Sequence, residues 1–536
     1  MRLTLRRGAA SIPPMRYRIT TLGCRVNHAE ARELESVLLA RGLVTAADGA
    51  PADLEVIHTC SVTGSAAAKS RHAIRRAIRR QGRGDELLEK SVHGSVDTSV
   101  RPRPARNVRQ ARSFSGTPSR SPTIIVTGCF GSTDPEEAAR LAGGWEQVIP
   151  HQAHDLSGPV DACAGTTLVQ RFAHRVDQYL ADRRARGSLR RPAPPSCRQT
   201  ILPLPVVTPQ KSAGAHVRAE LKIQDGCDAH CTFCVIPGIR RTLRSKTIPD
   251  AVREARQLVD LGHREIVLTG IFIGAYGHET ALRRKQSRAG RTPLADLIDA
   301  VAGVAGLARL RVSSMEPGDV SEELLDAMVA NQPVVVPHLH LPLQSASDAV
   351  LKRMNRQYRI GEYLEMIDQV NEALRTADGL GPAITTDIIC GFPGETDDDF
   401  ERTVEVASRV GFLHMHVFPY SARRGTAAAR WRDRFVAAPI TRTRVRRLID
   451  METDPADGLS IRYRRRLSGR TVRVILEQPD SQEPGVMTGR CDHYALVSVR
   501  TGRPRGALLQ VEVTQVTSDR TTAVPLETSV PLPQLV

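Results

Sequence analysis

The sequence predicts an α/β protein in three successive parts: a parallel α/β domain, an incomplete (β/α) barrel and a small β-barrel. Short β-rich runs alternate with helical patterns over the first 150 residues, and six further strand and helix units follow between about 216 and 425. Strand-like runs separated by turn residues come after 467. Strands that alternate with helices indicate parallel sheets, whereas consecutive short strands indicate a small all-β domain.

The predicted N-terminal domain, residues 15–150, repeats one local plan. The runs RYRITTLGC, LEVIHTC and TIIVTGC end at Cys24, Cys60 and Cys129, and a helical pattern follows each of them. The carboxyl ends of parallel strands share one edge of a sheet, where ligands commonly bind. We therefore expect the three cysteines to lie along the same edge.

Two segments interrupt this regular pattern. Residues 84–121 are rich in Arg, Ser, Gly and Pro with little periodicity, and we predict a disordered insertion there. Residues 151–213 are expected to form an interdomain linker with some helix in its middle. Neither segment carries a recognisable motif.

The central barrel is expected to span residues 214–450. Its candidate strands are 219–224, 264–269, 308–314, 337–343, 383–389 and 412–419. Six units suggest a barrel that does not close, and the functional residues of such a barrel lie just after its strands, on the C-terminal face. The last domain, residues 465–530, alternates in the strand manner between Gly, Pro and Asp turns, which is typical of a small RNA-binding β-barrel.

The composition favours an anionic macromolecular partner. Lys and Arg number 75 against 58 Asp and Glu, a formal net charge of +17, which suits RNA better than an acidic small molecule. No apolar run approaches the roughly 18 residues of a membrane span, and the N-terminus lacks the apolar segment of a secretory signal. The ten cysteines are therefore expected to be reduced thiols in a cytoplasmic protein.

Three cysteines after the first barrel strand form a specific motif. Cys227, Cys231 and Cys234 offer three thiolates, whereas a structural zinc site or a fully ligated iron–sulfur cluster takes four ligands. Three thiolates leave one iron of a [4Fe–4S] cluster open to S-adenosylmethionine (SAM), which an electron from the cluster then cleaves to a 5′-deoxyadenosyl radical. The alternative is a zinc knuckle completed by His230 or by a remote cysteine.

SAM also needs polar groups for its ribose and its methionine carboxylate, and the ends of the barrel strands supply candidates. These are Thr269, Gly270, Ser314, Glu316, Gln344 and Asp387. Phe233, beside the last cysteine of the motif, could pack against the adenine. An ordinary hydrogen bond at the end of a strand explains each polar candidate about equally well.

The segment LKIQDGCDAHCTFCVIPGIRR resembles the radical-SAM loop of methylthiotransferases, enzymes that insert a methylthio group into tRNA or into a ribosomal protein. The resemblance continues through LTGIFIGAYG, RVSSMEP, HLPLQSASDAVLKRMNRQY, TTDIICGFPGET and FPYSARRGT, and the C-terminal domain resembles a TRAM domain. It implies a radical-SAM barrel and a second [4Fe–4S] cluster on Cys24, Cys60 and Cys129. Three buried structural thiols are the alternative to this second cluster.

Within the family, TLGCRVN around Cys24 is most similar to the subgroup that acts on N6-threonylcarbamoyladenosine at tRNA position 37, next to the anticodon. This similarity implies a methylthio group added to C2 of that adenosine, with one SAM as methyl donor and a second as source of the radical. Family members that act on isopentenyladenosine in tRNA or on ribosomal protein S12 are alternatives. A non-catalytic RNA-binding iron–sulfur or zinc protein is an alternative of another class.

The resemblance also implies partners. These are tRNA, an electron donor such as flavodoxin or ferredoxin, and a sulfur source, with no membrane involved.

Overall fold

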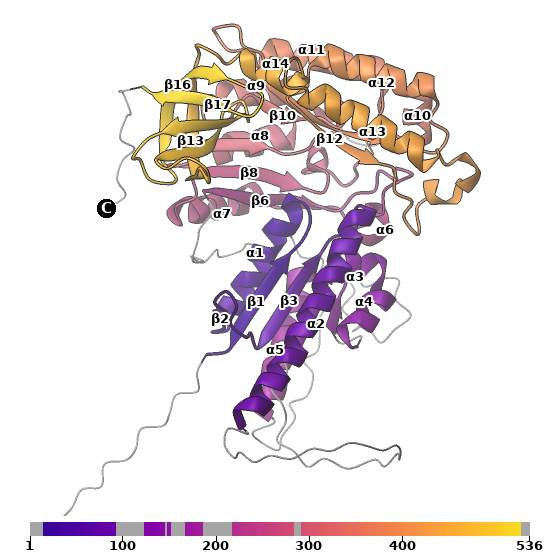
Figure 1. Ribbon diagram of the computed structural model, residues 1–536, viewed down its shortest axis with the longest axis vertical. Coiled ribbons are helices and arrows are strands. Elements are labelled where there is room, and N and C mark those ends of the chain that lie inside the picture. Colours follow the sequence, from indigo (N-terminus) through magenta and orange to yellow (C-terminus); the bar gives the residue numbers. More distant parts are fainter. Residues whose placement is uncertain are drawn as a thin grey trace, which may run out of the picture.

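The computed structural model describes residues 14–92, 123–144, 147–151, 167–185, 217–282 and 291–526. It has three parts: an N-terminal sheet with its helices, a central half-barrel, and a small β-barrel packed against one end of the half-barrel (Figure 1). The predicted fold class is therefore confirmed. Among the described helices, none is both long and apolar enough to cross a membrane.

The N-terminal domain is a parallel sheet with helices on its faces. Its elements are β1 (Arg16–Thr21), α1 (Arg25–Leu39), β2 (Val44–Thr45), β3 (Leu54–Thr59), α2 (Gly64–Val92), β4 (Thr123–Gly128), α3 (Cys129–Thr133), α4 (Pro135–Ala142), β5 (Val148–Ile149) and α5 (Leu168–Ala185). The strand order is β2-β1-β3-β4-β5. Cys24, Cys60 and Cys129 follow the neighbouring strands β1, β3 and β4, so they lie on one edge of the sheet, as predicted.

Two predictions about this domain were wrong in part. Helix α2 covers residues 84–92 of the predicted disordered insertion 84–121, because Glu, Leu and Lys in this stretch are strong helix formers. The helix expected in the middle of the predicted linker 151–213 is present as α5, but its residues Leu168, Phe172 and Val176 join the core of the domain, so this part is not a linker. The rest of the insertion and most of the linker lie outside the described residues.

The central part is the expected half-barrel. Its main elements are β6 (Arg218–Asp225), α6 (Ile236–Ile239), β7 (Arg244–Ser245), α7 (Ile248–Asp260), β8 (Glu265–Gly270), α8 (Pro293–Ala302), β9 (Arg309–Val312), α9 (Glu322–Ala330), β10 (His338–His340), α10 (Asp348–Arg353), α11 (Ile360–Ala373), β11 (Ala383–Cys390), α12 (Asp397–Val410), β12 (His414–Pro419), α13 (Ala438–Thr453) and α14 (Leu459–Arg465). All six predicted strands are present, in the sheets β7-β6-β8-β9 and β10-β11-β12. Isolated bridges from Leu310 to Val335 and from Ser314 to His340 join the two sheets.

Alternation along these strands separates an apolar outer face from a polar inner face. The outer positions, packed in the core under the helices, include Leu221, Ile266, Leu310, Leu339, Ile388 and Met415. The positions that alternate with them include Lys222, Glu265, Arg309, Arg311, His340, Asp387 and His416. These residues face the inside of the half-barrel, here called the lumen, which branched apolar side chains fill in closed (β/α) barrels.

The C-terminal domain is a closed β-barrel, as predicted. Its strands are β13 (Thr471–Pro479), β14 (Val486–Cys491), β15 (Leu496–Arg500), β16 (Leu508–Val516) and β17 (Thr521–Pro525), in the order β13-β14-β15-β17-β16. Arg309 and Arg311 of β9 donate hydrogen bonds to three backbone carbonyls of this barrel, at 2.7–2.9 Å. Glu265 of β8 accepts from both guanidinium groups, at 3.0 and 2.9 Å, and from Arg218 at 2.6 Å.

Glu265 therefore neutralises a buried cluster of arginines at this domain interface. Burial alone would raise the pKa of its carboxyl group, but the guanidinium groups of Arg311, Arg309 and Arg218 lower it. Replacing Glu265 by alanine leaves the buried Arg311 without an ion-pair partner among the described residues, whereas Arg309 keeps Asp492 and Arg218 keeps Glu477. An unpaired buried charge costs about 3–5 kcal/mol in comparable cases. We expect Glu265→Ala to lower the melting temperature clearly, and Glu365→Ala, a change on the exposed face of α11, to leave it near the wild-type value. Equal melting temperatures for the two variants would contradict this account.

Candidate active site

The loop after β6 brings Cys227, Cys231 and Cys234 together. Cys227 is 8 % exposed, and the backbone N–H of Cys234 donates to the carbonyl of Cys231 at 3.0 Å. Gly226 permits the turn into the loop, because its φ is +86° and a Cβ there would lie 2.1 Å from the carbonyl oxygen of Thr242. Burial raises the pKa of the Cys227 thiol, and the neighbouring thiols of Cys231 and Cys234 add to the shift.

Arg356 places a buried positive charge beside this loop. Its Nη1 donates to Sγ of Cys231 at 3.2 Å, and its Nη2 pairs with Oε1 of Glu316 at 2.5 Å. The two side chains are 6 % and 8 % exposed. Burial alone would lower the pKa of Arg356, but Glu316 raises it well above its usual value, so the group stays charged. A fixed cation next to a sulfur favours the thiolate, which is the form that binds metal.

The second triplet lies on the edge of the N-terminal sheet. Cys60 and Cys129 are 4 % and 2 % exposed, and Cys24 is exposed. A Cβ at Gly23 would lie 2.7 Å from the Cβ of Cys60, so the loop that carries Cys24 passes directly against the second cysteine. Burial raises the pKa of the Cys129 thiol to about 12, and the thiols of Cys60 and Cys24 contribute to this shift. The three sulfur atoms are therefore close enough to influence one another.

The two triplets face each other across the domain interface. Cys129 and Cys227 belong to one buried apolar cluster, together with Phe272. A cavity of about 570 Å³ lies at the same interface, lined by Cys60 on the N-terminal side and by residues 418–421 at the end of β12. A molecule in this cavity would contact both the N-terminal domain and the half-barrel.

The thiols in each triplet are spaced more widely than the ligands of a single zinc ion. A zinc ion holds thiolates at about 2.3 Å, which places tetrahedral sulfur ligands within about 4 Å of one another. In the part of the chain that the structure describes, the one group of metal-binding side chains with ligand atoms within 4.8 Å of one another contains no cysteine. In this structure neither triplet is thus contracted around a single ion.

A buried network of charges connects the two cysteine edges. Glu30 of α1 is 1 % exposed and accepts from Lys222 at 2.7 Å and from Arg240 at 2.6 and 2.9 Å. Asp225 pairs with the same two cations at 2.9 and 2.8 Å. Helix α1 starts directly after Cys24, and β6 leads into the loop of the other triplet. The network therefore sets how the two edges lie relative to each other.

Two residues predicted to bind SAM carry a buried oxygen that still needs a partner. Oε2 of Glu316 and Oε1 of Gln344 have no hydrogen bond within the described residues. A buried acceptor without a donor is costly, so such atoms mark places where a polar ligand binds. Glu316 also contacts the cluster loop through Arg356. The donor groups of SAM, its ribose hydroxyls and its amino group, fit these acceptors.

The other SAM candidates have less distinctive surroundings. Thr269 and Gly270 end β8, and Ser314 follows β9, where the sequence predicted them. Phe233 packs edge-on against Phe392, with 6.4 Å between ring centroids. Their contacts to SAM stay predictions.

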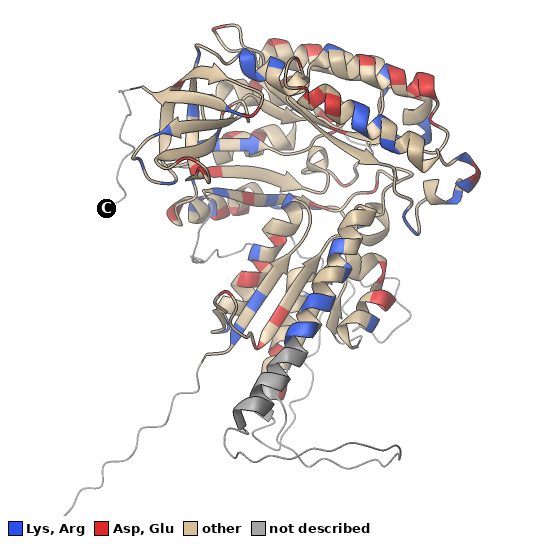
Figure 2. Ribbon diagram, in the orientation of Figure 1, with Lys and Arg blue, Asp and Glu red and all other residues tan. Residues whose placement is uncertain are grey.

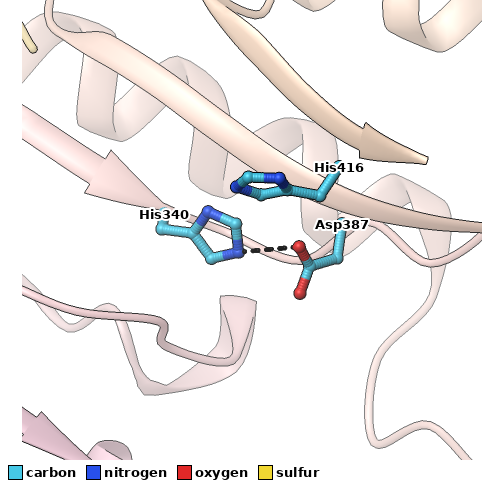
Figure 3. A group of neighbouring side chains, drawn as sticks. All are labelled: His340, Asp387 and His416. Atoms are coloured by element: carbon cyan, nitrogen blue, oxygen red, sulfur yellow. Dashed lines mark ion pairs between the residues drawn. The ribbon is translucent and has the colours of Figure 1, made fainter. Parts of the chain in front are cut away.

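The side chain of Asp387 has different neighbours from the remaining candidates, although its carbonyl accepts from the backbone N–H of Gln344 at 2.8 Å. It lies in the lumen, where Oδ1 is 3.2 Å from Nε2 of His340 and His416 lies alongside (Figure 3). The three side chains come from the adjacent strands β11, β10 and β12. Its surroundings thus differ from those of the residues that adjoin the cluster loop.

Sequence reasoning missed several of these residues. Arg356 lies in the run RMNRQY but was not singled out, and Glu30 gave no local signal because Lys222 and Arg240 are 192 and 210 residues away. The histidines left a detectable signal. Strands β10 and β12 carry HLH and HMH, and alternate residues of a strand share a face, so the two strands that flank β11 present histidines to the same side of the sheet.

The family models that match the chain are the Radical SAM superfamily, over residues 221–407, and Uncharacterized protein family UPF0004, over residues 16–94. A protein of Bacillus subtilis (strain 168) named threonylcarbamoyladenosine tRNA methylthiotransferase MtaB is 32 % identical over 479 residues, which are 89 % of this chain and 88 % of that protein. The chain belongs to the radical-SAM methylthiotransferase family. The resemblance drawn from its motifs is confirmed.

A second relative agrees with this membership. A tRNA-2-methylthio-N(6)-dimethylallyladenosine synthase of Acidothermus cellulolyticus is 30 % identical, covering 95 % of this methylthiotransferase and 87 % of that protein. Among solved structures, the radical S-adenosylmethionine methyltransferase TsrM of Kitasatospora setae aligns over 78 % of this chain and 77 % of its own, with a TM-score of 0.42 and 10 % identity. As a methylthiotransferase, the protein uses SAM and [4Fe–4S] clusters.

The network around Glu30 makes a prediction about acid stability. Burial alone would raise the pKa of Glu30, but Arg240 and Lys222 hold it well below its ordinary value of 4.5. A carboxyl group with a lowered pKa in the folded state stabilises the protein above its unfolded pKa and loses this contribution as the pH falls. We expect Glu30→Gln to be much less stable than wild type at pH 7, with a difference that shrinks below about pH 4.5. Urea unfolding of the metal-free proteins at several pH values measures this, and a constant difference would contradict it.

Proposed function

We propose that this methylthiotransferase adds a methylthio group to C2 of N6-threonylcarbamoyladenosine at tRNA position 37. One observation carries the proposal: two triplets of cysteines face each other across one buried interface, next to a cavity of about 570 Å³. This arrangement supports a reaction in which sulfur transfer and radical formation act on one substrate. A simple radical-SAM enzyme would need one triplet only.

In this proposal each triplet holds one [4Fe–4S] cluster. The ligands are Cys24, Cys60 and Cys129 for one cluster and Cys227, Cys231 and Cys234 for the other. When bound, the clusters and SAM supply the radical that removes hydrogen from C2 and the methylthio group that replaces it. The chain itself provides buried thiols, with Arg356 to hold Cys231 in place. It also excludes water from the interface, because Cys60, Cys129 and Cys227 are nearly buried.

SAM would lie next to the Cys227 triplet. Glu316 and Gln344 would accept hydrogen bonds from its hydroxyl or amino groups, because both present a buried oxygen without a donor among the described residues. Thr269, Gly270, Ser314 and Phe233 are proposed to complete this site on the strength of their position at strand ends and beside the loop.

Basic side chains on α2 support tRNA as the partner (Figure 2). Arg75, Arg76 and Arg79 are exposed on this helix, which begins four residues after Cys60. Such side chains bind phosphates of the RNA backbone. At the start of the C-terminal domain, by contrast, Arg470 and Arg473 pair with acidic residues of this chain. We therefore propose α2 as an RNA contact in addition to the β-barrel.

The relatives favour threonylcarbamoyladenosine over the alternatives. The relative named for this nucleoside is 32 % identical, and the relative named for dimethylallyladenosine is 30 % identical. The polar lumen of the half-barrel agrees with a polar target. An electron donor such as flavodoxin or ferredoxin and an external sulfur source complete the reaction, and the cytoplasm, where tRNA is modified, is the proposed location.

The cluster assignment is tested by counting iron and sulfide in anaerobically reconstituted protein. We expect about eight irons in the wild type and about four in the Cys24/Cys60/Cys129→Ala triple variant. Cys491→Ala serves as the matched control, because Cys491 is a buried thiol in the C-terminal domain and should keep the full iron content. Four irons or fewer in both the wild type and the triple variant would remove the basis for methylthiolation.

The activity itself is tested on tRNA that contains threonylcarbamoyladenosine. Nucleoside mass spectrometry should find the 2-methylthio product with wild type and none with the triple variant. Wild type that consumes SAM and leaves every tRNA unmodified would overturn the proposal.

Glu316 provides a separate test of the SAM site. Removing the charge of an acceptor that binds SAM costs about 1.5–3 kcal/mol, so we expect Glu316→Gln to bind SAM roughly tenfold or more weakly. Iron content should stay at the wild-type value, which separates this effect from loss of the cluster. Equilibrium dialysis with SAM measures the affinity, with Glu365→Gln on the surface of α11 as control. Unchanged affinity would exclude Glu316 from the SAM site.

A further inference from the structure

Three polar side chains form a layer in the lumen, on the last three strands of the half-barrel. His340, Asp387 and His416, here called the lumen layer, each bring one ligand atom to within 4.8 Å of the others (Figure 3). Nε2 of His340 lies 3.2 Å from Oδ1 of Asp387, and Nδ1 lies 2.9 Å from the hydroxyl of Thr385. Both ring nitrogens of His340 are therefore engaged, and this ring holds the Asp387 carboxylate in place.

His416 is the accessible member of the lumen layer. The side chains of His340 and Asp387 are 12 % and 30 % exposed, and His416 is more exposed than either. Its ring contacts His414 and Phe418, with centroid distances of 4.4 and 6.4 Å. Neither ring nitrogen has a hydrogen-bond partner in the part of the chain that the structure describes. A neutral imidazole offers one donor and one acceptor, so His416 can bind a polar group in the lumen.

The lumen layer adjoins the interface cavity that Cys60 and the end of β12 line. Phe418 follows His416 by two residues on the same face of β12, and it lines that cavity together with Cys60. Its ring is 36 % exposed, and exposed aromatic rings stack on nucleobases. Two residues of a strand span about 7 Å. A base stacked on Phe418 would thus place a substituent of similar length next to His416.

A positive charge lies below the lumen layer. Tyr494 of the C-terminal barrel stacks on His338, with 4.2 Å between the ring centroids. His338 lies two residues before His340 on the same face of β10. Arg490 and Arg311 lie over the Tyr494 ring at 4.4 and 5.1 Å, and Arg25 donates to its hydroxyl at 3.0 Å. The lumen layer therefore offers an acceptor on Asp387, and Arg25 and Arg490, which have no ion-pair partner among the described residues, add positive charge around Tyr494.

We propose that His340, Asp387 and His416 recognise the polar N6 substituent of the target adenosine. This inference rests on the proposed function and adds the residues that select the substrate. A threonylcarbamoyl group carries N–H and hydroxyl donors, which suit Asp387 and His416, and a carboxylate, which suits the positive side of the lumen. An isopentenyl group carries none of these. It would leave buried polar groups unpaired, which is how sites built for hydrogen bonding reject apolar analogues.

Two other occupants fit the same atoms and are outcomes of the test. Two histidines and one carboxylate are a known ligand set for divalent iron. Asp387 is also among the residues that the sequence predicts to bind SAM. His416 is the exposed member of the layer, and its ring lies 6.4 Å from that of Phe418, which favours the substrate.

The test compares wild type with Asp387→Asn and His416→Phe in the full-length, reconstituted enzyme. His414→Phe is the matched control, because His414 lies on the same strand but is held by Glu452 at 2.5 Å. The substrates are two anticodon stem-loop RNAs that differ only in the threonylcarbamoyl group. We measure the binding of both RNAs, the kcat/KM for C2 methylthiolation, the 5′-deoxyadenosine formed without RNA, and the metal content.

We expect wild type to bind the threonylcarbamoyl RNA more tightly than the unmodified RNA. Asp387→Asn and His416→Phe should lose this preference and lower kcat/KM on the modified RNA roughly 10- to 100-fold, while His414→Phe keeps both. In His416→Phe, formation of 5′-deoxyadenosine without RNA should not change. If 5′-deoxyadenosine formation falls while the binding preference for the threonylcarbamoyl RNA stays intact, the layer binds SAM. If the variants lose one metal ion per chain, the layer is a metal site. Either result overturns the inference.

The proposed function can fail separately. Wild type that cleaves SAM but leaves the threonylcarbamoyl RNA unmodified refutes that function. Wild type that modifies this RNA while both variants retain the binding preference refutes only the role of the lumen layer.

Discussion

The arrangement of this molecule depends on one buried carboxylate. Glu30 of α1 reaches across the domain interface to Lys222 and Arg240, at 2.6–2.9 Å and almost without exposure to solvent. A buried ion pair is a weak source of stability, because desolvation of both charges offsets their attraction. Its geometry is nonetheless specific, because any shift between α1 and β6 would leave charges unpaired in a dry interface. This constraint fixes the two cysteine edges against each other, and apolar packing alone would allow them to slide.

A second buried carboxylate acts in the same way at the other end of the half-barrel. Glu265 balances three arginines, and two of these bind backbone carbonyls of the C-terminal barrel. Tyr494 adds a link between all three domains, because it stacks on His338 and accepts a hydrogen bond from Arg25, the residue after Cys24. The domain proposed to bind RNA is thus rigidly connected to a candidate cluster site. A substrate held by one domain is presented to the others at a defined position.

The sequence predicts local features well and remote pairings poorly. Strands ending at Cys24, Cys60 and Cys129 were visible because period-two alternation and a strand-end cysteine are local patterns, and the Cys227 motif needs a few residues only. A helix was expected where α5 lies, but its place in the core was not, since its apolar face is explained only once α1 is known to lie beside it. The partners of Glu30 are about 200 residues distant in sequence, so no pattern within a short stretch of sequence could reveal them. The histidines of β10 and β12 were visible as an alternating pattern, but only the register of the sheet shows that they meet.

The polarity of the lumen explains where a substrate can be held. A closed (β/α) barrel fills its interior with apolar side chains, whereas this half-barrel lines its lumen with charges that each require a partner. Lys222 is paired by the N-terminal domain, and Arg309 and Arg311 are paired by Glu265 and the C-terminal domain. Among the described residues, the N-terminal and C-terminal domains supply no ion pair to the layer of His340, Asp387 and His416, which remains partly exposed. The other lumen charges named here are paired by groups of the chain itself. The lumen layer stays accessible, and it is therefore the part of the lumen suited to bind a polar ligand.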